Sequence, residues 1–259
     1  MKIENRTFIV SGGASGLGRA CVEDIVKHGG SAAILDLSED GKTFADELGP
    51  SARFFVCDVL DSSSIVKAVE GTVEWARATR RPLGGVIPAA GVSTPATILD
   101  RDGAAFNLDD VDFVLGVNLR GVLDLVSKSV EQMAKSEADT DGERGVVVMV
   151  ASSAAFDGQK GQLSYSASKG AVAAMTLPMA RDLARYGIRV VTIAPSLFET
   201  RMTSMMSAKV RKSLEATFEF PKRSGRPDEF ASLVRQSIEN SMLNGTVIRL
   251  DGGSRPSKI

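Results

Sequence analysis

A glycine-rich turn near the start of the chain most restricts the folds available to it. The apolar run Thr7–Ser11 leads into Gly12-Gly13-Ala14-Ser15-Gly16-Leu17-Gly18, and an amphipathic stretch follows at about 16–28. Glycines permit a tight turn and let backbone N–H groups approach a phosphate at the start of a helix. Strand, turn and helix stand in the order that dinucleotide binding requires, although an ordinary strand-to-helix loop is the alternative. We therefore predict that a cofactor pyrophosphate lies against Gly12, Ser15, Gly16, Leu17 and Gly18.

Apolar runs and amphipathic stretches alternate along the rest of the chain, which is typical of strand-helix-strand units and a parallel sheet. The expected strands are Thr7–Ser11, Ala32–Asp36, Arg53–Asp58, Gly85–Ala89, Val146–Ala151, Arg189–Ala194 and Thr246–Leu250. Helices are expected at about 16–28, 40–48, 62–79, 110–135, 163–185 and 227–240. With 259 residues and no Pro/Gly/Ser-rich linker, the chain is expected to form one α/β domain over 1–259, doubly wound with helices on both faces of its sheet.

Composition excludes several classes of protein. The chain has 31 basic and 32 acidic side chains, a balance that argues against nucleic acid or an acidic membrane surface as the main partner. Cys21 and Cys57 lie in apolar segments and indicate packing rather than a disulfide framework. No signal peptide and no apolar run of about 20 residues is present, so a soluble intracellular protein is expected. The single histidine, His28, cannot build a histidine triad or a multi-histidine metal site, and no metal is predicted.

Asp36 ends the second expected strand, 18 residues after Gly18. A carboxylate at this place accepts hydrogen bonds from an adenosine ribose and repels a 2′-phosphate, which favours NAD over NADP. The alternative for Asp36 is a helix cap, and Ser15, Arg19 and Lys42 leave room for the phosphorylated cofactor. Asp58 and Val59, at the end of the third strand, are expected to flank the adenine.

Tyr165 and Lys169 lie four residues apart in the expected helix at 163–185 and so share one face of it. A nearby ammonium favours the phenolate and lowers the pKa of a tyrosine from its usual value of about 10. The pair therefore predicts a tyrosine that transfers a proton near neutral pH. Such pairs also occur by chance on solvated helix surfaces, so the prediction depends on the rest of the chain.

The glycine turn and the later polar residues together resemble the short-chain dehydrogenase/reductase family over essentially the whole chain. The residues that carry the resemblance are Gly12, Gly16, Gly18, Asp36, Asp58, Asn118, Ser152, Tyr165 and Lys169. Within the family, Ala151–Lys169, 176–184 and 244–252 are similar to type 2 3-hydroxyacyl-CoA dehydrogenases. The resemblance implies a Rossmann-like seven-stranded sheet, a nicotinamide cofactor and a homotetramer built from the helices around 110–135 and 163–185.

The resemblance also implies a role for each polar residue. Tyr165 takes the alcohol proton, Ser152 orients the substrate, and Lys169 lowers the Tyr165 pKa and binds the nicotinamide ribose. Asn118 holds a water in a proton path, and helix–helix hydrogen bonding is the alternative for this residue. For Ser152 the alternative is a turn at the end of the strand. Further cofactor contacts are implied at Ala90, Gly91, Pro195 and Thr200. Gln162, three residues before Tyr165, is a candidate substrate contact on the same helical face.

The segment at about 196–223 is expected to form a lid over the substrate. It carries Met202, Met205 and Met206 among lysines and arginines. Methionines adapt to varied apolar shapes, and basic groups at the rim suit the phosphates of a coenzyme A thioester. A peripheral amphipathic helix is the alternative for the same segment.

Two positions depart from the family pattern. Pro88-Ala89-Ala90-Gly91 stands where the family has Asn-x-Ala-Gly, so a side-chain hydrogen bond is lost and proline removes a donor from a central strand. Pro195-Ser196 replaces the usual Pro-Gly and adds a side chain near the nicotinamide. Both changes bear on the substrate more than on the cofactor.

The leading hypothesis is an NAD-dependent enzyme that interconverts 3-hydroxyacyl-CoA and 3-oxoacyl-CoA. The alternatives are a ketone reductase of steroid or secondary metabolism and a noncatalytic NAD-binding structural or sensor protein. The last residues, Ser257-Lys258-Ile259, resemble the peroxisomal address Ser-Lys-Leu and predict a peroxisomal matrix location, with cytosol or mitochondrion as the other options.

Overall fold

A single seven-stranded sheet organises the computed structural model, which describes residues 1–204 and 206–255 and, at 201 and 202, the backbone alone. Every strand pairing is parallel, which confirms the predicted sheet. The strand order β3-β2-β1-β4-β5-β6-β7 reverses between β1 and β4 and so opens a crevice at the carboxyl ends. The strands are β1 (Thr7–Ser11), β2 (Ser31–Asp36), β3 (Ala52–Val56), β4 (Leu83–Pro88), β5 (Gly145–Val150), β6 (Ile188–Pro195) and β7 (Thr246–Leu250).

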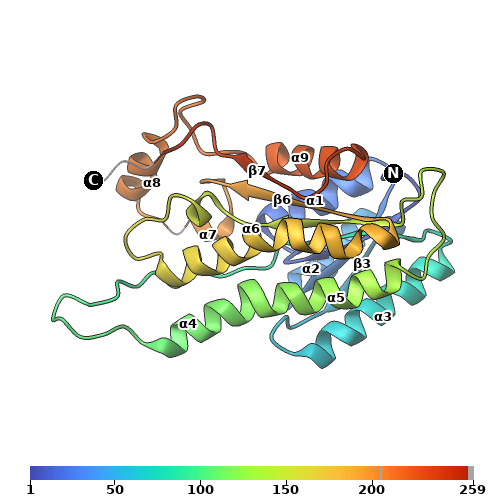
Figure 1. The fold of residues 1–259 in the computed structure, drawn as a ribbon, viewed down its shortest axis with the longest axis horizontal. Helices are drawn as coiled ribbons and strands as arrows, with labels where there is room; N and C mark the ends of the chain where they lie inside the picture. The colour runs from blue at the N-terminus through green and yellow to red at the C-terminus, as the bar shows by residue number, and fades with distance from the viewer. Residues whose placement is uncertain (205, 256–259) are drawn as a thin grey trace.

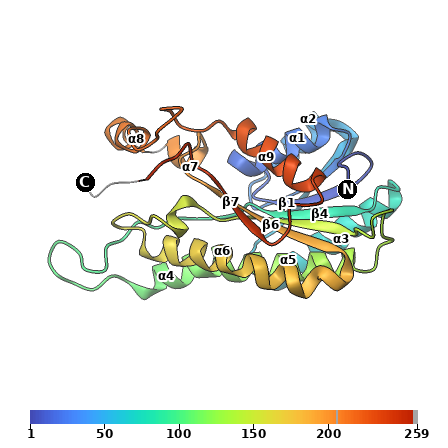
Figure 2. The same cartoon turned by 45° about the horizontal axis from the view of Figure 1, so that its top comes forward.

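Helices cover both faces of this sheet (Figures 1 and 2). One face carries α1 (Gly16–Lys27), α2 (Asp40–Leu48) and α9 (Pro227–Glu239). The other carries α3 (Ser62–Ala78), α4 (Leu108–Leu115), α5 (Val122–Met133) and α6 (Leu163–Leu183). The observed ends fall within a few residues of the predicted ones, as at β3, which was expected to run to Asp58 and ends at Val56.

Alternate residues of the central strands enter two separate apolar cores. Ile9 of β1 belongs to the core under α3, α5 and α6, whereas Phe8 and Val10 belong to the core under α1 and α9. All three side chains are fully buried. Burial on both faces explains why the strands read as continuous apolar runs in the sequence rather than as alternating ones.

The helix expected at 110–135 is interrupted in the structure. Residues Gly116–Gly121 form a π-helical segment between α4 and α5, where the sequence predicts one continuous helix. Gly121 lies close to the backbone of Val59, so an added Cβ would stand 2.6 Å from the Val59 carbonyl oxygen. The segment also holds Asn118, which is completely buried. π-Helical turns often occur at functional sites, and this one lies beside the carboxyl edge of the sheet.

Two excursions of the chain project at the carboxyl end of the sheet. Residues 92–107 form a long arm between β4 and α4, at the lower left of Figure 1. The segment expected to be a lid contains α7 (Arg201–Ser204) and α8 (Ala208–Glu215) at the upper left. Its role as a lid stays a prediction, and Met205 lies outside the described residues.

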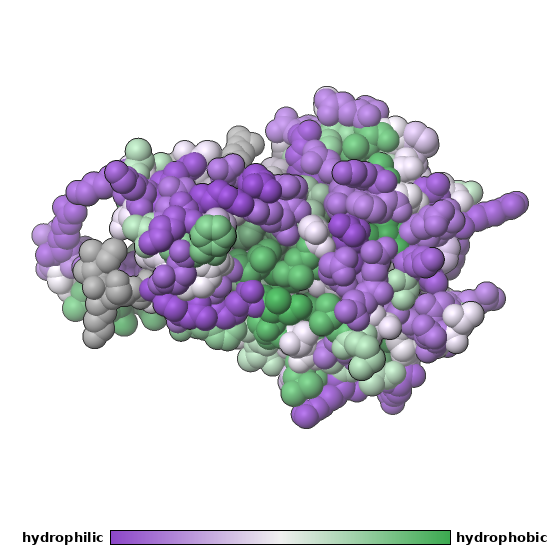
Figure 3. Space-filling model, turned by 90° about the horizontal axis from the view of Figure 1, so that it is seen from above, coloured by the Kyte–Doolittle hydropathy of each residue, from purple (hydrophilic) through white to green (hydrophobic). Residues whose placement is uncertain are grey.

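Part of the molecular surface is apolar. Seen from above, hydrophobic residues gather over the middle of the molecule between hydrophilic margins (Figure 3). On the helices α4 to α6, Phe113, Leu123, Leu163 and Leu177 are each at least 40% exposed. Exposed apolar area of this kind often marks contact with other molecules. None of the described helices has the length and apolarity to cross a membrane.

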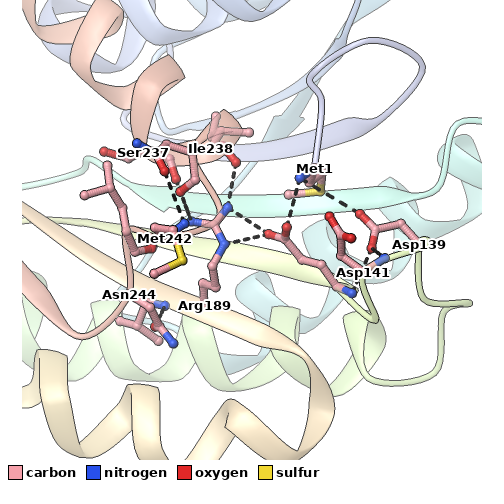
Figure 4. Close-up of polar contacts among 12 residues, drawn as sticks. Met1, Asp139, Asp141, Arg189, Ser237, Ile238, Met242 and Asn244 are labelled. Carbon is pink, nitrogen blue, oxygen red and sulfur yellow. Dashed lines mark hydrogen bonds and ion pairs between the residues drawn. The ribbon is translucent and has the colours of Figure 1, made fainter.

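A buried ionic cluster, which we call the amino-end network, lies where β5 and β6 begin (Figure 4). Arg189 pairs with Glu143 at 2.7 Å, and both side chains are at most 8% exposed. The same guanidinium donates to the carbonyl oxygens of Ser237, Ile238, Asn240 and Leu243. The Met1 amine donates to the other Glu143 oxygen at 2.9 Å. The network therefore fastens the end of α9 to the sheet.

Pro88 ends β4 without breaking the sheet. The Ala89 N–H donates to the Ser11 carbonyl oxygen at 3.1 Å, so by alternation the Pro88 nitrogen faces β5. In the described part of the chain, β4 pairs with β5 at Gly85 and Val86. The N–H that Pro88 lacks would therefore lie beyond the paired residues of β4 and β5. After the strand, the Ala90 N–H donates to the Ser11 hydroxyl at 3.3 Å.

Candidate active site

The glycine turn connects β1 to the start of α1. Gly12 and Gly16 have φ values of +64° and +54°, and a Cβ at Gly12 would lie 2.8 Å from the Ala90 nitrogen. A Cβ at Gly18 would overlap the Gly12 carbonyl oxygen. Ser15 is the N-cap of α1, yet its side chain makes no capping hydrogen bond. The first N–H groups of α1 therefore have no side-chain cap and are suited to bind an anion such as a pyrophosphate.

A cavity of about 460 Å³ opens beside this turn, along the carboxyl ends of the strands. It brings together all the residues predicted to contact the cofactor. They are Gly12, Ser15, Gly16, Leu17, Gly18, Asp36, Asp58, Val59, Ala90, Gly91, Tyr165, Lys169, Pro195 and Thr200. Ser152 lines the same cavity, whereas Asn118 and Gln162 do not appear in its lining.

Asp36 ends β2 and lines the cavity where the sequence predicts the adenosine ribose. One carboxylate oxygen accepts from the Ala14 N–H and the other from the Ser38 N–H, each at 3.1 Å. The backbone thus holds the carboxylate, whose remaining lone pairs can accept hydroxyl groups of a ribose. Asp58 also lines this end, with one oxygen accepting from the Leu60 N–H at 2.9 Å.

Ser152, Tyr165 and Lys169 form the polar group at the other end of the cavity. Ser152 follows β5, and its hydroxyl hydrogen-bonds the phenol of Tyr165 in the first turn of α6. The same oxygen accepts from the Ala154 N–H at 3.1 Å, so the strand-end turn considered as an alternative is present as well. Lys169 Nζ donates to the Val150 carbonyl oxygen at 2.8 Å and lies 5.9 Å from the centre of the Tyr165 ring.

The acidity of this group differs from the sequence-based expectation. Burial raises the pKa of Tyr165, and the hydrogen bond with Ser152 opposes that rise. Burial also lowers the pKa of Lys169 to about 8. The structure therefore departs from the expected lowering of the Tyr165 pKa by Lys169, because desolvation is the largest effect on the phenol and the Lys169 ammonium donates to the Val150 carbonyl. Ser152 is the group that favours the phenolate here.

Asn118 uses its whole side-chain amide within the protein. Its Oδ1 accepts from the Val92 N–H at 2.9 Å, and its Nδ2 donates to the Val92 carbonyl oxygen at 2.9 Å and to the Ser168 hydroxyl at 3.1 Å. The interhelical hydrogen bond considered as the alternative is thus present. A water in a proton path would need another group of this residue, such as its backbone carbonyl.

Gln162 and Thr200 occupy different settings. The Gln162 side-chain oxygen accepts from the Gln159 N–H at 2.9 Å, so the side chain folds back onto its own loop. Thr200 lines the cavity, and its hydroxyl is 3.3 Å from the hydroxyl of Thr203. The predicted nicotinamide contact therefore lies at the cavity, while the predicted substrate contact is not among the residues that line it.

The chain matches the model of the family described as short chain dehydrogenase over residues 6–211. It belongs to the short-chain dehydrogenases. The 3-hydroxyacyl-CoA dehydrogenase type-2 of Bos taurus is 43% identical over 255 residues, 98% of this chain and 96% of the relative. The enzyme of the same name from Drosophila melanogaster is also 43% identical over 255 residues, 98% of each chain.

Solved structures place this short-chain dehydrogenase in the same fold. A 3-hydroxyacyl-CoA dehydrogenase type-2 from Mycobacterium avium superposes with a TM-score of 0.92 at 35% identity, covering 98% of this chain and 97% of the other. A 3-ketoacyl-(acyl-carrier-protein) reductase from Brucella melitensis, complexed with NADH, has a TM-score of 0.83 at 25% identity, covering 97% and 99%. The predicted family, fold and oxidoreductase class are thereby confirmed.

Several residues of the dehydrogenase cavity were missed in the sequence. Phe113 of α4 and Thr203 of α7 line it, although their patterns read as ordinary helix surface. Cys57 also lines the cavity, and burial raises the pKa of its thiol to about 11, which agrees with a packing role. Ser196 lines it too, at the position that departs from the family pattern. The described residues contain no group of three or more His, Cys, Asp and Glu able to hold a metal ion.

Proposed function

We propose that this short-chain dehydrogenase uses NAD to interconvert a 3-hydroxyacyl-CoA and the 3-oxoacyl-CoA. The observation that carries the proposal is one cavity with Ser152, Tyr165 and Lys169 at one end and Asp36 with the glycine turn at the other. Similarity to enzymes named 3-hydroxyacyl-CoA dehydrogenase type-2 over nearly the full length supports the substrate class. Exposed Lys209 and Lys212 on α8 provide positive charge that suits coenzyme A phosphates.

The residues of the site divide the chemistry among them. Tyr165 removes the hydroxyl proton of the alcohol, and in the reverse direction returns it to the carbonyl oxygen. Ser152 has one hydroxyl hydrogen, which favours the phenolate in the structure and would pass to the substrate oxygen when substrate binds, so that this oxygen lies beside the phenolate. Lys169, held by the Val150 carbonyl, lies where it can bind a ribose hydroxyl. The nicotinamide, when bound, accepts or supplies the hydride.

NAD is the proposed cofactor in preference to NADP. The Asp36 carboxylate is fixed by two backbone N–H groups at the adenosine end of the cavity. A fixed negative charge there would repel a 2′-phosphate, whereas it would accept hydrogen bonds from an unmodified ribose. Arg19, which the sequence left as a possible phosphate partner, instead pairs with Glu23 and stacks on Phe44.

An assay at the nicotinamide absorbance tests the proposal. Purified protein is given 3-hydroxybutyryl-CoA with NAD or with NADP, and in parallel a panel of non-thioester secondary alcohols and ketones, steroids included. We expect NADH formation from the thioester and little reaction with NADP. Turnover confined to a non-thioester ketone would favour the alternative reductase, and NAD binding without any turnover would favour a sensor or structural protein.

We further propose a peroxisomal matrix location and a homotetramer. The location depends on Ser257-Lys258-Ile259, which lie outside the described residues. Replacing Ile259 with a charged residue should leave a tagged protein diffuse, whereas unchanged puncta would remove the idea. The exposed apolar side chains of α4 to α6 support an assembly through these helices, which sedimentation would test.

A further inference from the structure

The segment that joins Ser152 to Tyr165 is tied to the far edge of the sheet. After the short 3-10 turn Ser153–Ala155, it continues as a loop until α6 begins at Leu163. Asp157 in this loop forms an ion pair with Arg249 of β7. The two residues are 92 positions apart in the sequence, and the pair closes the loop over the carboxyl end of β7.

Arg249 is held in one orientation by several groups. Its Nε donates to an Asp251 oxygen at 2.6 Å, and its guanidinium lies 5.2 Å from the centre of the Phe156 ring. Arg255 donates to the same Asp251 oxygen at 2.9 Å. The Arg249 and Asp157 side chains are only 23% and 27% exposed, so solvent screens their attraction less than it would at the open surface.

The residues after β7 also fasten the predicted lid. The N–H groups of Glu219 and Phe220 donate to the Gly252 carbonyl oxygen at 3.0 and 3.2 Å. The hydroxyls of Thr217 and Ser254 lie 2.7 Å apart. The end of β7 thus connects the Ser152–Tyr165 loop on one side with the end of the lid segment on the other.

We infer that Arg249 is a positioning residue, which sets the geometry of Ser152 and Tyr165 through its ion pair with Asp157. The predicted adenosine half of the cofactor site is built at the ends of β1 to β4, and neither Asp157 nor Arg249 is among the residues that line the cavity. Loss of Arg249 should therefore affect the proton-transfer step and leave NAD binding intact. The inference rests on the proposed function, because it concerns the same reaction.

The test compares Arg249→Ala with a matched control, Arg235→Ala. Arg235 pairs with Asp24 at 3.2 Å and is 25% exposed, but it lies on α9, away from the cavity. Arg249→Ala should lower kcat by about 10- to 100-fold, since displacement on the order of 1 Å can cost about 10²-fold. The NAD dissociation constant and the pH at half-maximal kcat should not move. Arg235→Ala should leave all three values unchanged.

A double-mutant cycle identifies the route of the effect. If Arg249 acts through Asp157, the variant with both Arg249→Ala and Asp157→Ala should be no slower than Arg249→Ala alone. If the fold-losses in kcat of the two single variants multiply in the double variant, the inference is overturned. So would an unchanged kcat in Arg249→Ala, or a fall that is matched by weaker NAD binding.

Hydrogen exchange separates this inference from the proposed function. In Arg249→Ala, exchange of the backbone amides in 153–162 should accelerate while exchange in 12–18 stays the same. Equal exchange in 153–162 would overturn the inference. If the wild-type protein fails to oxidise 3-hydroxybutyryl-CoA, the proposed function is wrong, and the exchange comparison still decides the role of Arg249.

Discussion

The two ends of the sheet each bury a basic side chain, but they treat its charge differently. Arg189 at the amino end is 7% exposed and meets the Glu143 carboxylate and four carbonyl oxygens. Lys169 at the carboxyl end is 5% exposed and donates to the Val150 carbonyl. Among the described residues, no carboxylate lies within ion-pair distance of Lys169.

The difference separates a charge that stabilises the fold from one that is available for chemistry. Arg189 has its charge balanced and its donors occupied, and a guanidinium keeps its proton in proteins. Lys169 lacks a counter-ion, and burial therefore lowers its pKa to about 8. The Lys169 ammonium has three N–H donors, and those that the Val150 carbonyl does not occupy can bind a ligand in the cavity. The comparison predicts that changes at the amino end lower stability and spare turnover, whereas changes at the carboxyl end lower turnover.

Tyr165→Phe should give the largest effect on turnover. Removing the phenol oxygen takes away the proton-transfer group, so kcat should fall by at least about 10²-fold, the usual contribution of general acid-base catalysis. NAD binding and the thermal midpoint should change little. Steady-state kinetics, cofactor titration and thermal unfolding measure the three quantities.

The chain supplies its own control, because Tyr186 is the other of its two tyrosines. Tyr186 lies at the surface, where its hydroxyl accepts from Arg185 at 2.7 Å. Tyr186→Phe should leave turnover unchanged. Equal turnover in Tyr165→Phe and the wild type would contradict the assignment of the site.

Glu143→Ala should give the largest effect on stability. The substitution leaves Arg189 buried without its carboxylate, and breaking a buried pair in this way costs about 3–5 kcal/mol. Urea unfolding at pH 7 should show this loss in the free energy of unfolding. The kcat of the folded fraction should stay near the wild-type value, because the network lies at the opposite end of the sheet from the cavity.

Glu131 provides the comparison for that experiment. It pairs with Lys135 at 2.9 Å, but both side chains are 58% exposed. Glu131→Ala should leave the free energy of unfolding close to that of the wild type, as is usual for exposed pairs. Similar losses from both variants would mean that the amino-end network is not a distinct source of stability.

Lys169→Met should remove turnover and yet stabilise the folded protein at pH 7. Burial holds the folded pKa of Lys169 near 8, below its ordinary value of 10.5, so the unfolded chain binds the proton more tightly. The charged form therefore destabilises the wild type by an amount on the order of 3 kcal/mol below pH 8, and this penalty disappears as the pH rises from 8 to 10.5. The advantage of the Met variant should shrink over the same window.

Unfolding free energies at pH 7, 8, 9 and 10 check the effect, with Lys135→Met at an exposed position as control. A Met variant that is less stable than the wild type at pH 7 would mean that the buried ammonium is well compensated. In that case the contrast between Lys169 and Arg189 would not hold.

The sequence predicts the regions that obey a repeating pattern. The strands were found because both faces of the sheet are buried. The residues predicted to contact the cofactor line one cavity because glycine turns and strand-end carboxylates follow a fixed order. The position of each predicted cofactor residue along the cavity could therefore be expected from the fold class. Ser152, Tyr165 and Lys169 were found from the family pattern, and the structure brings them together.

The features that were missed depend on contacts between distant residues. Glu143 and Arg189 are 46 positions apart, and Arg189 sits in a strand that otherwise reads as apolar. The pair of Asp157 and Arg249 likewise carries no local signal. The direction of the Tyr165 pKa was predicted wrongly because the spacing to Lys169 was visible while the desolvation of the phenol was not.

The π-helical turn at Gly116–Gly121 has a consequence for how this chain tolerates insertions and deletions. Such a turn amounts to one extra residue in an otherwise regular helix. Deleting a single residue there would let the turn close as an ordinary α turn, so α4 and α5 could keep their facing while the residues inside the turn would take new directions. The Asn118 amide could then no longer hydrogen-bond Val92 and Ser168 at the same time. The number of residues in this stretch is therefore as constrained as their identity.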